Sequence, residues 1–190
     1  MRAAVKIRIA LPSYAIVLIA LVSALTGCGS PARPNASAPA QQNIYVTNAC
    51  NGTVTVYPVG SSGNVAPLVP NPALCGPSSI AVEKTNGDLY VVNSENGTIT
   101  AYAKGSNGSV APKISLSDDT LQGLRIALDT SGRLYAYVSP ASKGIIQIYA
   151  SGANGDAQPI ASIIGSNTGL DYISALAVDP EGTILCGGQQ

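Results

Sequence analysis

An internal repeat is the feature that most restricts what this chain can fold into. The stretch NIYVTNACNGTVTVYPVGSSGNVAP begins at residue 43, and related stretches begin at residues 88 and 133. A shorter stretch, TILCGGQQ, begins at residue 183, so successive copies are 45, 45 and 50 residues apart. Repeat proteins build one small unit several times, and each unit buries its apolar surface only against its neighbours. We therefore expect a row of similar units.

Each repeat is predicted to contain four short β-strands. Residues 44–48 and 89–93 are rich in β-branched side chains, and an Asn-Gly pair that favours a tight hairpin follows each of them. Residues 53–57 and 98–102 supply the next strand, and a glycine-rich turn then leads into a proline-containing edge strand. Apolar runs such as residues 78–82 are predicted to be the innermost strand, which is buried on both faces. Short strands at this spacing are typical of β-propellers and similar arrays.

A family resemblance supports this interpretation. Residues 80–102 have the pattern IAV…G.LYV.N…NGTI..Y, which resembles the NHL-type β-propeller repeat, and residues 45–48 spell the YVTN motif of a related repeat. The resemblance covers residues 43–190 and implies an all-β, β-propeller-like array of four-stranded antiparallel blades, about three blades plus a partial fourth. Because propeller rings usually have at least about four blades, we expect an open or truncated propeller that exposes apolar blade faces.

The N-terminus contains a separate signal. Residues 1–8 are basic, residues 9–24 are apolar, and LTGC closes the segment at residues 25–28. This pattern resembles a bacterial lipoprotein signal, in which Leu, a small residue and Gly precede an acylated Cys. The resemblance implies that residues 1–27 are a signal peptide and that palmitate or similar acyl chains on Cys28 anchor the protein. The alternatives are an ordinary cleaved signal peptide and an uncleaved transmembrane anchor.

The predicted domain organisation follows from this signal. Residues 28–42 comprise the lipidated Cys28 and a disordered tether rich in Pro, Ala and Ser, and residues 43–190 form the repeat domain. Lipid anchoring predicts a location in the bacterial cell envelope, with the domain exposed to the periplasm or the exterior. Gly29 stands where an Asp would retain a lipoprotein at the inner membrane, so the resemblance slightly favours the outer membrane.

The composition excludes several kinds of function. The chain has no histidine, which excludes Ser–His and Cys–His nucleophile pairs and histidine metal ligands. Ten basic and ten acidic residues balance, and three of the basic ones lie within the first eight residues. A nucleic-acid groove needs clustered Lys and Arg, so no nucleic-acid partner is expected.

Three cysteines lie in the repeat domain. Cys50 follows the first YVTN strand, and Cys75 precedes the apolar run at 78–82. In a propeller blade these two connections lie on the same face, and the cell envelope is often oxidising. Two interpretations stay open, a Cys50–Cys75 disulfide and two free thiols. Cys186 is interpreted as a small buried hydrophobic residue, since no histidine is present to activate it.

Acidic residues in connections on that same face form a candidate cation or ligand site: Glu95, Asp118, Asp119 and Asp171. Carboxylates that converge there could hold Ca²⁺ or another divalent cation. The resemblance to gluconolactonase-like propellers implies such a metal, but no complete ligand set can be assigned, and solvated loop acids are the alternative. No cofactor is therefore expected. Three acids after the inner strands are interpreted as turn formers on the opposite face: Glu83, Asp129 and Asp179.

Three functional hypotheses remain, because the propeller fold hosts enzymes as well as pure interaction modules. The leading one is a non-catalytic binding module, tethered to a membrane through Cys28, whose partner is a glycan or protein of the envelope. The second is a metal-dependent enzyme of the lactonase or lyase type. The third is a truncated copy of a longer propeller lipoprotein. A homo-oligomer that completes a ring is a further expectation, since an open array leaves apolar faces uncovered.

Overall fold

The computed structural model describes residues 42–68, 74–106, 108, 110–117, 125–139 and 144–188. Its secondary structure consists of twelve β-strands and one short 3-10 helix, η1 (Ala49–Asn51). The predicted signal peptide, Cys28 and nearly all of the predicted tether lie outside the described residues. Within the described ranges, no helix has the length and apolar character needed to cross a membrane.

The strands are short, as the repeat predicts. Their bounds are β1 (Asn43–Asn48), β2 (Thr53–Pro58), β3 (Pro77–Val82), β4 (Leu89–Asn93), β5 (Thr98–Tyr102), β6 (Ile114–Ser117), β7 (Arg125–Leu128), β8 (Leu134–Val138), β9 (Ile145–Tyr149), β10 (Ala161–Ile163), β11 (Ile173–Val178) and β12 (Ile184–Gly188).

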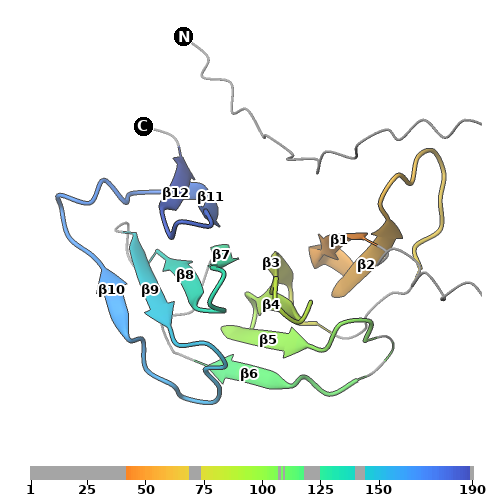
Figure 1. Cartoon of the computed structure of the whole chain (residues 1–190), viewed down its shortest axis with the longest axis horizontal. Helices are drawn as coiled ribbons and strands as arrows, with labels where there is room; N and C mark the ends of the chain where they lie inside the picture. Colours follow the sequence, from red (N-terminus) through yellow and green to blue (C-terminus); the bar gives the residue numbers. More distant parts are fainter. Residues whose placement is uncertain are drawn as a thin grey trace, which may run out of the picture. The chain divides into compact units, whose positions relative to one another are not determined.

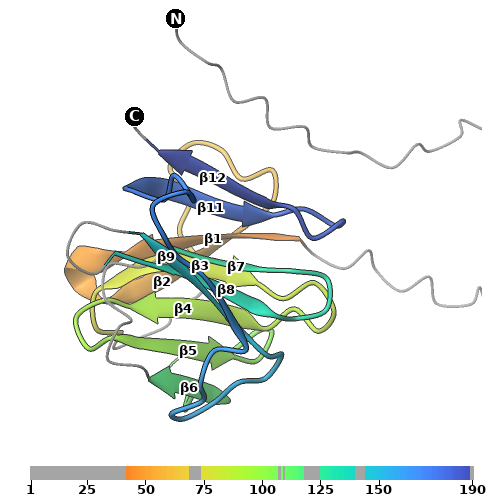
Figure 2. The same cartoon turned by 90° about the vertical axis from the view of Figure 1, so that its left-hand side faces the viewer.

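These strands form four separate antiparallel sheets that follow one another along the chain (Figure 1). Two sheets have four strands each, in the orders β3-β4-β5-β6 and β7-β8-β9-β10, and each begins with the apolar run predicted to be innermost. Figure 2 shows β4, β5 and β6 side by side within one sheet. The hairpins β1–β2 and β11–β12 flank them. The predicted fold class is thus confirmed as part of a propeller, with two complete blades between two hairpins.

The hairpin turns confirm the prediction from the Asn-Gly pairs. Gly52 joins β1 to β2 and Gly97 joins β4 to β5, and both have a φ of 63°. Side chains with a Cβ rarely adopt this left-handed conformation, so glycine is the residue that fits. The turn sets the pairing register, and Leu89 of β4 therefore lies opposite Tyr102 of β5.

The pleat of each strand sends alternate side chains to the two faces of its sheet. In β4, Leu89 and Val91 belong to the cluster shared with the β1–β2 hairpin, whereas Tyr90 and Val92 belong to the cluster shared with the next sheet. Every residue of β4 is buried. A strand can be apolar on both faces only where a sheet is covered on both sides, which explains its continuous apolar sequence.

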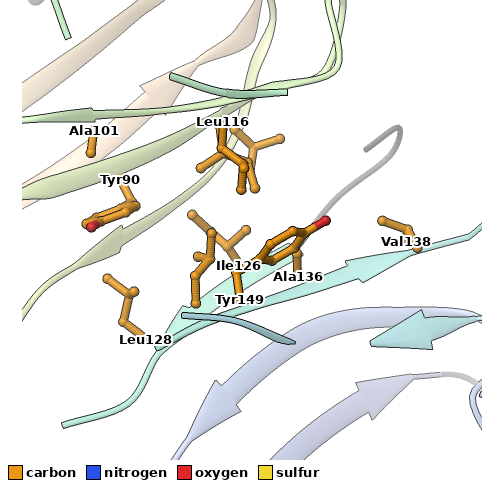
Figure 3. Close-up of a cluster of buried hydrophobic side chains, with 11 residues drawn as sticks. Tyr90, Ala101, Leu116, Ile126, Leu128, Ala136, Val138 and Tyr149 are labelled. Carbon is orange, nitrogen blue, oxygen red and sulfur yellow. The ribbon is translucent and has the colours of Figure 1, made fainter. Parts of the chain in front are cut away.

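Three interfaces between successive sheets contain the buried apolar residues. The first lies between β1–β2 and β3–β6, the middle one between β3–β6 and β7–β10, and the last between β7–β10 and β11–β12. Figure 3 shows the middle interface, where Tyr90 and Leu116 of one sheet point toward Ile126 and Leu128 of the next. The buried residues are Val54, Leu74, Leu89, Val91 and Tyr102 in the first interface, Tyr90, Val92, Ile99, Ala101, Leu116, Ile126, Leu128, Leu134, Ala136, Val138 and Tyr149 in the middle one, and Tyr135, Tyr137, Ile146 and Ile173 in the last.

Hydrogen bonds also connect neighbouring sheets. The amide of Ile126 in β7 donates to Ser79 Oγ in β3 at 3.2 Å, and Arg125 Nε donates to the Ser174 carbonyl in β11 at 2.9 Å. At the outer edge, the Ser117 amide donates to the Gly155 carbonyl at 2.9 Å. The sheets are therefore connected at their inner and outer strands as well as through apolar packing.

Asp129 organises the turn between β7 and β8, in agreement with its prediction as a turn former. Its Oδ1 accepts hydrogen bonds from the amides of Ser131 (2.8 Å) and Arg133 (3.0 Å), and its Oδ2 accepts from Arg133 Nε (2.7 Å). The Tyr135 hydroxyl donates to the same Oδ2 at 3.2 Å. Burial by itself would raise the pKa of Asp129, but these hydrogen bonds from Arg133 and Ser131 outweigh it and lower the pKa.

The buried position of Ile146 in the last interface predicts a large stability effect. Ile146→Ala is expected to lower the free energy of unfolding by about 2–5 kcal/mol, because it removes buried apolar atoms and leaves a cavity. Ile160→Ala is the matched control, since Ile160 is exposed next to the same sheet and should change the value by about 0.5 kcal/mol at most. Urea unfolding followed by circular dichroism measures both, and equal losses would contradict the placement of Ile146.

The lowered pKa of Asp129 predicts a pH dependence of stability. A carboxyl group whose pKa is lower in the folded than in the unfolded chain stabilises the fold above its unfolded value of about 3.9. This contribution disappears as the pH falls through the folded pKa. Asp129→Asn should therefore unfold with a shallower dependence on pH between about 5 and 2 than the unmodified protein. Parallel pH profiles for the two proteins would contradict this assignment.

Candidate functional site

The four acidic residues predicted to hold a cation are only partly described. Asp118 and Asp119 lie outside the described residues. Glu95 follows β4, and its amide donates to the Cys75 carbonyl at 3.2 Å. Asp171 precedes β11, and its backbone carbonyl accepts a hydrogen bond from the Tyr137 hydroxyl at 2.7 Å. Among the described residues, no three Cys, Asp or Glu side chains are grouped so that they could hold a metal ion. The cation site stays a prediction.

Cys50 and Cys75 lie on adjacent loops, but the structure has them as exposed free thiols. The loops meet one or two residues away from the cysteines, where the Leu74 amide donates to the Gly52 carbonyl at 2.9 Å. A Cβ at Gly52 would lie only 2.4 Å from the Leu74 carbonyl oxygen, so glycine permits this close approach. The expectation that both residues lie on the same side is consistent with these contacts. The disulfide itself is not formed in the structure.

The interpretation of Cys186 as a buried residue is wrong, because its side chain is exposed. Cys186 lies in β12, which pairs only with β11 among the described strands. Its counterpart Ala136 lies in β8, which is covered by a strand on each side and is fully buried. The apolar sequence around Cys186 suggested burial, but burial depends on neighbouring strands that the described structure does not contain here.

The outward face of the β1–β2 hairpin carries two exposed apolar side chains. We call Ile44 and Val46 the N-terminal open face; their side chains are 44% and 40% exposed. Their counterparts one repeat later, Leu89 and Val91, are only 7% and 0% exposed because the β1–β2 hairpin covers them. The same repeat positions are thus buried where a neighbouring sheet is present and exposed where the described structure has none.

The other end of the array has a corresponding surface. We call Ala175, Ala177 and Leu185 of the β11–β12 hairpin the C-terminal open face, and all three are exposed. Leu185 is 55% exposed, whereas its counterpart Tyr135 in the preceding blade is 3% exposed. The expectation that an open array exposes apolar faces agrees with these values for the described residues.

The two open faces are complementary by repetition. In the middle interface, Tyr90 and Val92 on one face of β4 pack in the same cluster as Leu134 and Ala136 on the facing side of β8. Leu185 of the C-terminal open face has the repeat position of Tyr90. Ile44 and Val46 of the N-terminal open face have the repeat positions of Leu134 and Ala136. The open faces are therefore the two halves of an interface that already occurs inside the molecule.

Comparisons with known proteins support the fold. The family model described as "NHL repeat" matches residues 74–102, which contain β3, β4 and β5. Among solved structures, the chain is similar to a chain of Kuenenia stuttgartiensis hydrazine synthase, with a TM-score of 0.54 and 16% sequence identity. The match covers 76% of this chain and 38% of the hydrazine synthase chain, so it shows a common fold over part of a longer protein. No curated protein sequence matches the chain.

Proposed function

We propose that this chain is a non-catalytic binding module of the bacterial cell envelope, held at a membrane by acyl chains on Cys28. The lipobox-like LTGC sequence at residues 25–28 supports the anchor. The NHL repeat and the propeller-like blades support the binding role. The N-terminal tether would place the repeat domain away from the membrane surface, within reach of a partner in the envelope.

The observation that carries the binding role is the pair of open faces. Contiguous apolar surface on a sheet is unfavourable in water and is typical of a contact site for another macromolecule. Ile44 and Val46 at one end, and Leu185 at the other, are large apolar side chains that stay 44%, 40% and 55% exposed. A partner that covers either face would remove this apolar area from water, and that burial is the main favourable term in protein association.

The partner that we propose is a second copy of this chain. The C-terminal open face of one copy would pack on the N-terminal open face of the next, as the complete blades do in the middle interface. Such a head-to-tail contact uses two different surfaces, and it closes into a ring where the geometry allows. Anchoring in one membrane would raise the effective concentration of the copies and favour this contact.

The lipid anchor is tested by replacing the acylated residue. In a bacterial host given radiolabelled palmitate, the unmodified chain is expected to incorporate label and to sediment with membranes. Cys28→Ser should lose the label and the membrane association, because no thiol remains for acylation. Cys186→Ser is the control and should behave like the unmodified chain. Label that persists in Cys28→Ser would exclude this residue as the anchor.

Self-association is tested with one charge on each open face. The full-length chain in detergent micelles should form oligomers in analytical ultracentrifugation. Val46→Glu or Leu185→Glu alone should weaken this association at least about tenfold, because a carboxylate would be buried in an apolar contact. Ile160 is exposed and lies outside both open faces, so Ile160→Glu should leave the association unchanged.

A mixture of the two variants distinguishes the head-to-tail arrangement. The Val46→Glu chain keeps an intact C-terminal open face, and the Leu185→Glu chain keeps an intact N-terminal one, so the mixture should form a 1:1 pair that neither variant forms alone. A monomeric unmodified chain would contradict the second copy as partner. Binding of that monomer to an envelope protein or glycan would then identify a different occupant and leave the binding role intact.

A further inference from the structure

The first interface contains a half-open apolar pocket that is separate from both open faces. Its volume is about 140 Å³, and it lies between the β1–β2 hairpin and the β3–β6 sheet. Tyr45 and Val54 line it from the hairpin, and Leu89 and Tyr102 line it from the sheet. An apolar cavity of about 150 Å³ is large enough to bind benzene, so a pocket of this size can hold one six-membered ring.

Two polar residues that line the pocket, Asn43 and Lys104, would orient a bound ligand. Asn43 lines it, and its Oδ1 is buried without a hydrogen-bond donor among the described residues. A buried acceptor without a donor is unfavourable, and a ligand hydroxyl could supply the missing hydrogen bond. Lys104 also lines the pocket, and its side chain passes close to Gly87, where a Cβ would lie 2.8 Å from Lys104 Cδ. The structure records no ion pair of Lys104 with another described residue.

The middle interface shows why the space in the first interface is open. Asp88 has the repeat position of Asn43, and Lys113 has the repeat position of Leu68. Asp88 and Lys113 form an ion pair in the middle interface. Asp88 Oδ1 also accepts a hydrogen bond from the Lys104 amide at 3.3 Å. The first interface has a neutral amide, Asn43, and an aliphatic side chain, Leu68, at these positions. These two side chains cannot form the ion pair that occupies the same place in the middle interface.

A second difference adds to the space. In the middle interface, Glu83 from the turn after β3 lies against Gly132, where a Cβ would be 2.8 Å from Glu83 Oε1. Ala153 packs onto the same cluster. Among the described residues, the β1–β2 hairpin has no inner strand. Gly87 therefore lacks, within the described structure, a side chain that would cover it as Glu83 covers Gly132. The pocket is a consequence of these changes to an otherwise repeated interface.

We infer that this pocket is a binding site for a small monocyclic aromatic acid that carries a hydroxyl group. The ring would lie between the apolar walls that include Tyr45 and Tyr102, where aromatic rings make favourable edge and face contacts. The hydroxyl would donate to Asn43 Oδ1, and the carboxylate would pair with the Lys104 ammonium. This site is independent of self-association, because Tyr45 points into the first interface while Ile44 and Val46 point away from it.

The test uses the full-length chain in phospholipid nanodiscs and 4-hydroxybenzoate as the probe, with isothermal titration calorimetry as the measurement. The probe should bind at one site per chain. Benzoate, which lacks the hydroxyl, and phenol, which lacks the carboxylate, should each bind about tenfold more weakly. Equal affinity for the three compounds, or no heat of binding at millimolar concentrations, would overturn the inference.

Two variants locate the binding site. Val56→Phe should abolish binding because the larger side chain fills the pocket, whereas Val59→Phe, at an exposed position outside the pocket, should not. Lys104→Met keeps a flexible, unbranched side chain but removes its charge, so 4-hydroxybenzoate should then bind only as well as phenol. Unchanged binding by Lys104→Met would overturn the role of Lys104, even if Val56→Phe failed to fold. Self-association should be the same for Lys104→Met and the unmodified chain.

Discussion

The structure depends on one constraint: each sheet is apolar on both faces and needs a neighbour on each side. In β4, Leu89 and Val91 contribute to the first interface, and Tyr90 and Val92 contribute to the middle one. Because every repeat has this two-faced pattern, one packing arrangement joins successive sheets throughout the described chain. Hydrogen bonds such as Ile126 to Ser79 connect the inner strands, but burial of the two faces is what requires the next sheet to be present.

Both proposed binding surfaces occur where this constraint is not met. The open faces are repeat positions without a neighbouring sheet in the described structure, and Leu185 is exposed there although its counterpart Tyr135 is buried. The pocket occurs where the neighbour is present but altered, with Asn43 in place of Asp88 and no counterpart of Glu83 among the described residues. Each proposed binding surface is thus a local exception to a repeated interface.

Much of the fold could be predicted from the sequence because the relevant signals are local and repeated. The Asn-Gly pairs predicted the turns at Gly52 and Gly97, and the apolar runs predicted the inner strands β3, β7 and β11. The role of Asp129 could also be predicted, since an acidic residue after a strand and before a glycine is typical of a turn. The exposure of Cys186 could not, because it depends on which described strands lie beside β12 rather than on its own apolar neighbours.

By itself, the sequence determined the period, the order of the strands within each blade and the side of the sheet to which each residue belongs. Strand pairing and side-chain alternation follow from residues that are close in the chain, so a repeated pattern is sufficient to predict them. Only the tertiary structure decided that the loops of Cys50 and Cys75 meet at Gly52 and Leu74 and that Asn43 and Lys104 line one pocket. These features depend on how two sheets approach each other, which is set by the packing of many side chains at once.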